Sequence, residues 1–246
     1  MIYESCFTFW LSADSPMPYR QTENVARKLA ARHGAILAAA RDAAVEGGMA
    51  AVQMAPVAER AGVAAGTLYR YFPSKAHLVE ALVTALARDE TTALAAAANA
   101  APGPLSALAA AITAFAMRAL ARRRLAFALI AEPVEPDVDR ARAGYRRALV
   151  ATFEGLIRRA LAGGRLPEQD ASLAASALVG ALVEGLIAPL APVAGNDPGK
   201  VRAQVQTLAL FALRALGVVD ARARGLVVQT VLPAAPAGER DDGRAR

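Results

Sequence analysis

The sequence predicts an all-α protein of about nine helices. Alanine, leucine and arginine dominate the chain, while aromatic residues make up only 5%. The three dominant residues lose little side-chain entropy in a helix. Apolar residues recur at steps of three and four positions, which is the period of a helix with one buried face. Glycine and proline separate these periodic segments, so several helices are expected rather than a few long ones.

The first part of the chain has the pattern of a small three-helix domain. A helix is expected from Val25 to Glu46, where Gly47 and Gly48 follow. Two short helices over residues 55–60 and 65–72 come next, joined by a turn that contains Gly62. This arrangement predicts a helix-turn-helix domain over residues 23–75. We expect residues 1–22 to be a flexible arm and residues 1–16 to come from an over-extended reading frame.

The rest of the chain predicts a larger helical domain over residues 76–218. Ser74 caps a connecting helix that extends to Asn99, and a Pro-Gly-Pro break follows at residues 102–104. Apolar stripes then predict helices within residues 105–116, a short helix before Pro133, and a long helix over residues 145–160. Residues 171–190 are apolar nearly all round, and Asp197 caps a last helix. A disordered tail is expected over residues 219–246.

Composition favours a nucleic-acid partner and gives no sign of an enzyme. The formal net charge is +6 and the pI is about 10.0, so the chain attracts polyanions. Cys6 is the single cysteine, which excludes an internal disulfide and a multi-cysteine metal site. Both histidines, His33 and His77, fall in the first domain, and no nucleophile-elbow or dinucleotide pattern occurs. We therefore expect no catalytic residues, no metal and no cofactor.

A membrane span over residues 171–190 was weighed against a buried helix. Ser172, Ser176 and Glu184 make the segment a poor membrane span, whereas burial on more than one side explains its composition. We expect a cytoplasmic protein with no membrane partner.

The helix-turn-helix segment divides into a packing side and an outward side. Val57, Ala58, Val63, Leu68 and Phe72 supply the packing. The outward side begins with small residues, which let a helix approach base edges in the major groove, and continues with hydroxyl, aromatic and cationic residues. Its members are Ala64, Ala65, Gly66, Thr67, Tyr69, Arg70 and Tyr71. Lys75, at the start of the next helix, is placed to reach a phosphate.

These residues make the stretch from about Arg32 to Leu82 resemble the DNA-binding domain of the tetracycline-repressor family. The runs Val52-Gln-Met and Gly66-Thr-Leu-Tyr-Arg-Tyr-Phe-Pro-Ser-Lys75 are similar to the family's sterol-catabolism repressors. The resemblance implies that Gln53, Thr67, Tyr69 and Lys75 contact phosphates, and that Gly66, Arg70 and Tyr71 lie in or beside the groove. Ala64 departs from the serine of many relatives and lacks a capping hydroxyl.

The same resemblance implies a homodimer with an effector pocket in the second domain. The family pairs its last two long helices with those of a second subunit. We expect this interface at Ala177, Gly180, Ala181, Val205, Leu208 and Ala212. We expect the pocket at Phe115, Arg118, Phe127, Tyr145 and Leu149.

The resulting hypothesis is a ligand-released repressor that binds a pseudo-palindromic DNA operator. The apolar second domain favours a lipophilic small-molecule effector, with an acyl thioester as the candidate. A multidrug-sensing repressor and a ligand-independent DNA-binding dimer are the alternatives. Single residues also have alternative roles, since Tyr71 could be half-buried support, Arg70 could be a solvated charge, and the Arg122–Arg124 run could be either an anion site or solvated.

Overall fold

The computed structural model describes residues 19–130, 132, 136–189, 191–192, 195 and 197–230. Within these residues the chain is all-helical, as predicted, with ten α-helices and one short 3-10 helix, η1 Met49–Ala51. The α-helices are α1 Tyr19–Gly47, α2 Met54–Arg60, α3 Ala65–Tyr71, α4 Lys75–Asn99, α5 Pro104–Ala121, α6 Arg123–Ile130, α7 Pro136–Ala162, α8 Ala171–Leu186, α9 Pro198–Ala215 and α10 Asp220–Gln229.

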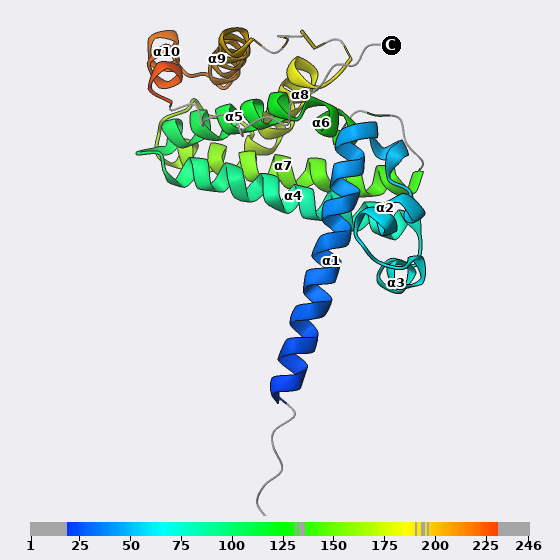
Figure 1. The fold of residues 1–246 in the computed structure, drawn as a ribbon. Coiled ribbons are helices and arrows are strands. Elements are labelled where there is room, and N and C mark those ends of the chain that lie inside the picture. The colour runs from blue at the N-terminus through cyan, green and yellow to red at the C-terminus, as the bar shows by residue number, and fades with distance from the viewer. Residues whose placement is uncertain are drawn as a thin grey trace, which may run out of the picture.

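Helix α1 starts earlier than the sequence predicted and projects from the rest of the molecule (Figure 1). Its second half packs into the first domain through buried Ile36, Ala40 and Ala44. Residues 24–35 are all exposed. Residues 19–22, expected in a flexible arm, belong to this helix, and the remainder of the predicted arm lies outside the described residues.

Helix α4 is a single helix of 25 residues that reaches from the first domain into the second (Figure 1). The Ser74 hydroxyl caps it by accepting from the His77 N–H at 3.4 Å, as the sequence predicted. Leu82 and Leu94 are buried along it. The helix packs against α5 and α7, whose buried Ile112 and Phe153 contribute to the same core.

Helix α5 is long and apolar enough to cross a membrane by length and composition, but most of it is buried in this core. A central helix of a helical domain has the same composition, because it is covered by other helices on several sides. Helix α8, which covers most of the apolar segment 171–190, has 16 residues.

The segment between α1 and α2 is tied to the second domain by a partly buried polar contact. The Glu132 carboxylate, just after α6, accepts from the Met49 N–H of η1 at 2.9 Å. Buried Arg142 of α7 donates to the Glu132 carbonyl, and its Nη2 donates to the Ala128 carbonyl at 2.6 Å. Elements η1, α6 and α7 are therefore joined through Glu132.

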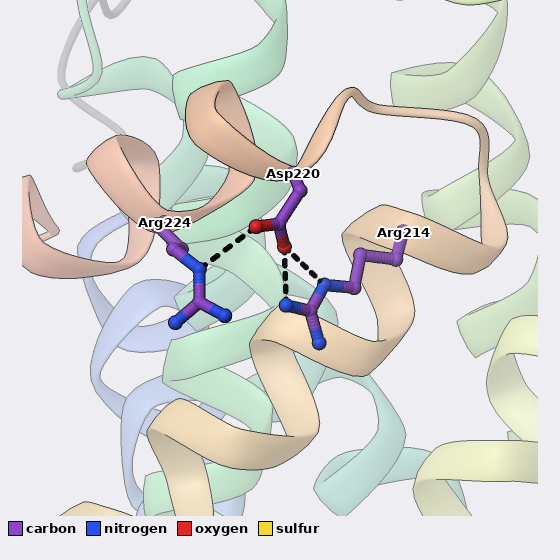
Figure 2. A network of polar contacts seen from close by, with 3 residues as sticks. All are labelled: Arg214, Asp220 and Arg224. Carbon is purple, nitrogen blue, oxygen red and sulfur yellow. Dashed lines mark hydrogen bonds and ion pairs between the residues drawn. The ribbon is translucent and has the colours of Figure 1, made fainter.

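The expectation of a disordered tail from residue 219 is wrong for its first part, because residues 220–229 form α10. Ala223 and Leu226 are buried, and the helix packs against α9 and α5. Asp220 lies between two arginines and accepts from Arg214 of α9 and from Arg224 of its own helix (Figure 2). The arginine- and alanine-rich composition concealed these few anchoring residues, and residues 231–246 lie outside the described part.

Replacing Gly48 with alanine is expected to lower the free energy of unfolding by about 1–3 kcal/mol. Gly48 has φ 72° and ψ −170°, a backbone region that is essentially restricted to glycine. A Cβ there would also lie 2.8 Å from the Glu132 carboxylate. Urea unfolding of Gly48→Ala measures the loss.

Gly155→Ala is the matched control, because Gly155 is in α7 and a Cβ there meets nothing within 4 Å. This control is expected to gain about 0.5–1 kcal/mol from better helix propensity. Equal stability of Gly48→Ala and wild type would contradict the view that the backbone at residue 48 and its close approach to Glu132 require glycine.

Candidate nucleic-acid interface and ligand cavity

Helices α2 and α3 form the predicted helix-turn-helix. The turn between them needs Gly62, which has φ 64°, and the Val63 N–H donates to the Ala58 carbonyl at 3.0 Å. Val57, Ala58, Leu68 and Phe72 are buried between the helices and the rest of the domain. The packing side of the motif is thus as the sequence indicated.

The outward side of α3 is open to solvent. Tyr69 is 51% exposed, and a Cβ on Gly66 would meet no heavy atom within 4 Å. Ala64 caps α3 through its carbonyl alone, with no side-chain hydrogen bond. Among the predicted DNA-contacting residues, Thr67 and Lys75 are half-buried. The exposed ones are Gln53, Ala64, Ala65, Gly66, Tyr69 and Arg70. The surface they form has small side chains at the start of α3 and polar side chains at its end.

Tyr71 differs from these residues because it turns towards the domain. Its side chain is half-buried, and its hydroxyl is buried with no hydrogen-bond partner among the described residues. Its ring centroid lies 6.4 Å from that of His33 on α1. This placement is that of a supporting residue, the alternative that the sequence left open.

Charges near the motif fall into a paired and an unpaired group. Arg60 of α2 forms an ion pair with Glu46 of α1 at 2.6 Å. The hydrogen bond from Arg60 lowers the pKa of Glu46, so both groups are ionised at neutral pH. Within the described part of the chain, Arg70 and Lys75 enter no ion pair. Their charges are therefore available to a polyanion.

A cavity of about 360 Å³ lies in the second domain, with walls supplied chiefly by α4, α5 and α6. Of the five predicted pocket residues, Phe115, Arg118 and Tyr145 line it, whereas Phe127 and Leu149 do not. Leu149 is fully buried in the core of α7. The apolar walls are Leu86, Ala93, Ala97, Ala114, Phe115, Met117, Ala119, Leu125, Ala126, Leu129, Ile130 and Ile187, and the polar lining is Arg41, Asp89, Glu90, Arg118, Arg122 and Tyr145.

The polar part of the cavity is organised around Glu90 of α4. Its Oε2 accepts from Arg118 Nε at 2.8 Å, while its Oε1 is buried without a hydrogen-bond partner in the described residues. Burial raises the pKa of Glu90, and the charge of Arg118 opposes that effect. Burial, with a smaller contribution from the Glu90 charge, raises the pKa of Tyr145. A ligand here would meet a carboxylate oxygen that lacks a donor.

The spacing of residues along α4 carries a signal for Glu90. Glu90 lies four residues after Leu86 and four before fully buried Leu94, so it stands on the inward stripe of α4. A carboxylate on such a stripe needs a buried partner or a ligand, because burying a charge alone is costly.

Helices α8 and α9 present an apolar groove at the surface. Leu173, Ala177, Ala181 and Phe211 line it, and Leu173 and Phe211 are 70% and 55% exposed. Of the predicted interface residues, Ala177 is exposed, and Gly180, Ala181 and Leu208 are half-buried. Val205 is 0% exposed in the core of its own subunit, which contradicts its place at an interface, whereas Ala212 is 2% exposed but lines this groove. Sequence reasoning missed Leu173 and Phe211, which are the large apolar side chains of this surface.

Comparison with known proteins matches residues 36–82 to the family described as bacterial regulatory proteins, tetR family. The HTH-type transcriptional repressor KstR of Rhodococcus jostii is 62% identical over 58 residues, which are 24% of this chain and 26% of that protein. KstR of Mycobacterium tuberculosis is 59% identical over 58 residues, covering 24% and 25% of the two chains. The match thus spans about a quarter of the length of these relatives.

Solved structures share the fold over most of the chain. The resorcinol complex of RolR covers 86% of this chain and all of that one, with a TM-score of 0.62 and 23% identity. FadR of Bacillus halodurans, a fatty acid degradation regulator, covers 76% and 97%, with a TM-score of 0.64 and 20% identity. FadR of Bacillus subtilis in complex with stearoyl-CoA covers 80% and 98%, with a TM-score of 0.56 and 18% identity. The similarity to the tetR family of bacterial regulatory proteins is thus confined to residues 36–82, and these solved structures, each under 25% identical, show the fold alone.

Proposed function

We propose that this protein is a sequence-specific DNA-binding transcriptional repressor of the cytoplasm. The proposal rests on the outward face of α3. This face has small, exposed residues at Ala65 and Gly66 and larger, exposed polar side chains at Tyr69 and Arg70. A helix of this kind fits the major groove, where its first residues approach base edges and its later residues meet phosphates. The similarity of the first domain to KstR, which is named a repressor, supports the direction of regulation.

The proposed repressor acts as a homodimer. Exposed Leu173 and Phe211 flank the groove between α8 and α9, where small Ala177 and Ala181 permit close approach of a second copy. A two-fold dimer would present two copies of α3 to half-sites about 34–36 Å apart, which is one turn of DNA. The operator is then a pseudo-palindrome.

The proposed effector site is the cavity walled by α4, α5 and α6. Helix α4 lines this cavity through Leu86, Glu90 and Ala93 and begins at Lys75, next to α3. Helix α6 is joined to η1 through Glu132. A ligand that favours one arrangement of these helices would therefore favour one spacing of the two recognition helices.

A lipophilic effector that bears a hydroxyl donor is our first candidate. The walls are mainly apolar, and Glu90 Oε1 lacks a donor although its carboxylate already pairs with one cation, Arg118. A hydroxyl group would satisfy this oxygen without adding charge. RolR, which has a similar fold, was solved with resorcinol, a ligand that carries hydroxyl groups.

An acyl thioester, the candidate from the sequence, is the second candidate. Arg41, Arg118 and Arg122 line the cavity and could meet an anionic headgroup. FadR of Bacillus subtilis, again similar in fold, was solved with stearoyl-CoA. A multidrug sensor would instead bind lipophilic cations, for which buried Glu90 would be the counter-charge.

The proposed function is tested by selecting bound sequences from random duplex DNA with the purified protein. We expect an enriched inverted repeat. Lys75→Ala should weaken binding to that repeat without changing the selected sequence, and the salt dependence of log K should fall by about 0.9 because one phosphate contact is lost. Arg159→Ala in α7, an exposed cation outside the motif, is the matched control. Absence of any enriched sequence with the wild-type protein would contradict the proposal.

The effector proposal is tested by titrating the protein with resorcinol, stearoyl-CoA and ethidium. We expect resorcinol to bind and to release the selected DNA. Glu90→Gln should weaken its binding about tenfold, because a hydrogen bond to a charged group becomes one to a neutral group. Glu80→Gln makes the same change at an exposed position of α4 that does not line the cavity, and it should leave the affinity for resorcinol nearly unchanged.

Selective binding of stearoyl-CoA would replace the first candidate with the second, and preference for ethidium would indicate the multidrug sensor. Binding of none of the three would contradict a ligand-responsive cavity of any of these kinds and favour the ligand-independent dimer.

A further inference from the structure

We propose that the projecting half of α1 is a second DNA-binding surface, which contacts the phosphates beside each operator half-site. The proposal rests on the proposed DNA-binding function and adds residues outside the helix-turn-helix. The surface consists of Arg27, Lys28 and Arg32, and we call it the α1 cationic surface.

The helix carries these residues away from the domain without covering them. Residues 24–35 are exposed throughout, and at 1.5 Å per residue they form a rod about 18 Å long. Figure 1 shows this rod continuing past α3, away from α4, α5 and α7. An isolated helical rod buries none of its own apolar surface, so a partner that covers it would add stability.

From residue 24 to residue 41 the charge of the helix has one sign, and Glu23 precedes this stretch. Residues 24–41 contain Arg27, Lys28, Arg32 and Arg41 and no carboxylate. Arg41 lies close to Asp42 at 3.5 Å, and Arg27 donates to the neutral Asn24 side chain. Among the described side chains, Arg27, Lys28 and Arg32 enter no ion pair. A polyanion is the complementary partner, since it would exchange bound counterions for these cations.

The position of the rod relative to α3 identifies the partner as the DNA held by α3. The His33 ring lies 5.1 Å from the Phe72 ring at the end of α3, so α1 leaves the domain beside the recognition helix. A duplex seated on the outward face of α3 would extend along the rod. Phosphates flanking the half-site are therefore the nearest anions to the α1 cationic surface.

Pairing of two α1 rods is the competing use of this surface. Val25 and Leu29 are 55% and 45% exposed and continue the stripe that ends in buried Ile36. In a pair of identical rods, however, Lys28 and Arg32 beside this stripe would meet their own copies, and like charges at short range are unfavourable. Against DNA the same cations are attracted, and the apolar side chains can lie against sugars.

The test is the salt dependence of binding by a triple variant, Arg27→Gln, Lys28→Gln and Arg32→Gln. Each lost phosphate contact lowers the slope of log K against log salt by about 0.9, so the slope should fall by about 2–3. Affinity at about 0.1 M salt should fall at least tenfold. A triple variant Arg159→Gln, Arg165→Gln and Arg202→Gln, which makes the same charge change at exposed positions elsewhere, is the control.

A second arm shortens the DNA instead of changing the protein. On a duplex trimmed to the selected half-sites, the wild type should bind as weakly as the triple variant does on a long duplex. An unchanged slope in the variant would overturn the α1 cationic surface while the proposed function stood. Loss of self-association in the variant, measured by sedimentation, would overturn it in favour of paired rods, whereas wild type that binds no DNA would contradict the proposed function itself.

Discussion

The continuity of helix α4 is the constraint on which the rest of the structure depends. One unbroken helix starts at Lys75, directly after the helix-turn-helix, and lines the cavity at Leu86, Glu90 and Ala93. Because a helix is stiff along its length, a tilt of α4 at the cavity would also displace its first turn, beside the helix-turn-helix. The buried Leu82 and Leu94 hold this helix against α5 and α7.

A second connection, through Glu132, fixes the position of the first domain relative to the second. The Glu132 carboxylate holds the Met49 N–H, and buried Arg142 holds the backbone carbonyls around Glu132. Helix α6, which supplies Leu129 and Ile130 to the cavity, thereby leads to η1 at the entrance of α2. The first domain is thus held at α4 and at η1, on either side of the helix-turn-helix.

Local sequence signals predicted most of the helix boundaries. The contacts between segments that lie far apart in the sequence could not be predicted from such signals. Gly62, the Ser74 cap and the Asp197 cap are read from a few neighbouring residues, so the elements they define were predicted closely. Phe115, Arg118 and Tyr145, which the sequence proposed as pocket residues, do line a cavity, but whether that cavity holds an effector stays a prediction. Glu90 was missed, and Val205 was assigned to the dimer surface although it is buried, because only the packing of α4, α5, α8 and α9 decides which side of each helix is covered. The α10 helix rests on Ala223, Leu226 and Val227, too few to stand out from a polar segment.

The most direct test of the account is the distance between spin labels on the two subunits. A single label is placed at exposed Glu59 of α2 as Glu59→Cys, with the natural cysteine removed as Cys6→Ser. The account predicts an intersubunit distance that narrows to one value on the selected operator and changes when an effector releases the DNA, and that is lost in Phe211→Glu. A protein with no intersubunit coupling, or with the same distances in the free, DNA-bound and effector-bound states, would contradict it.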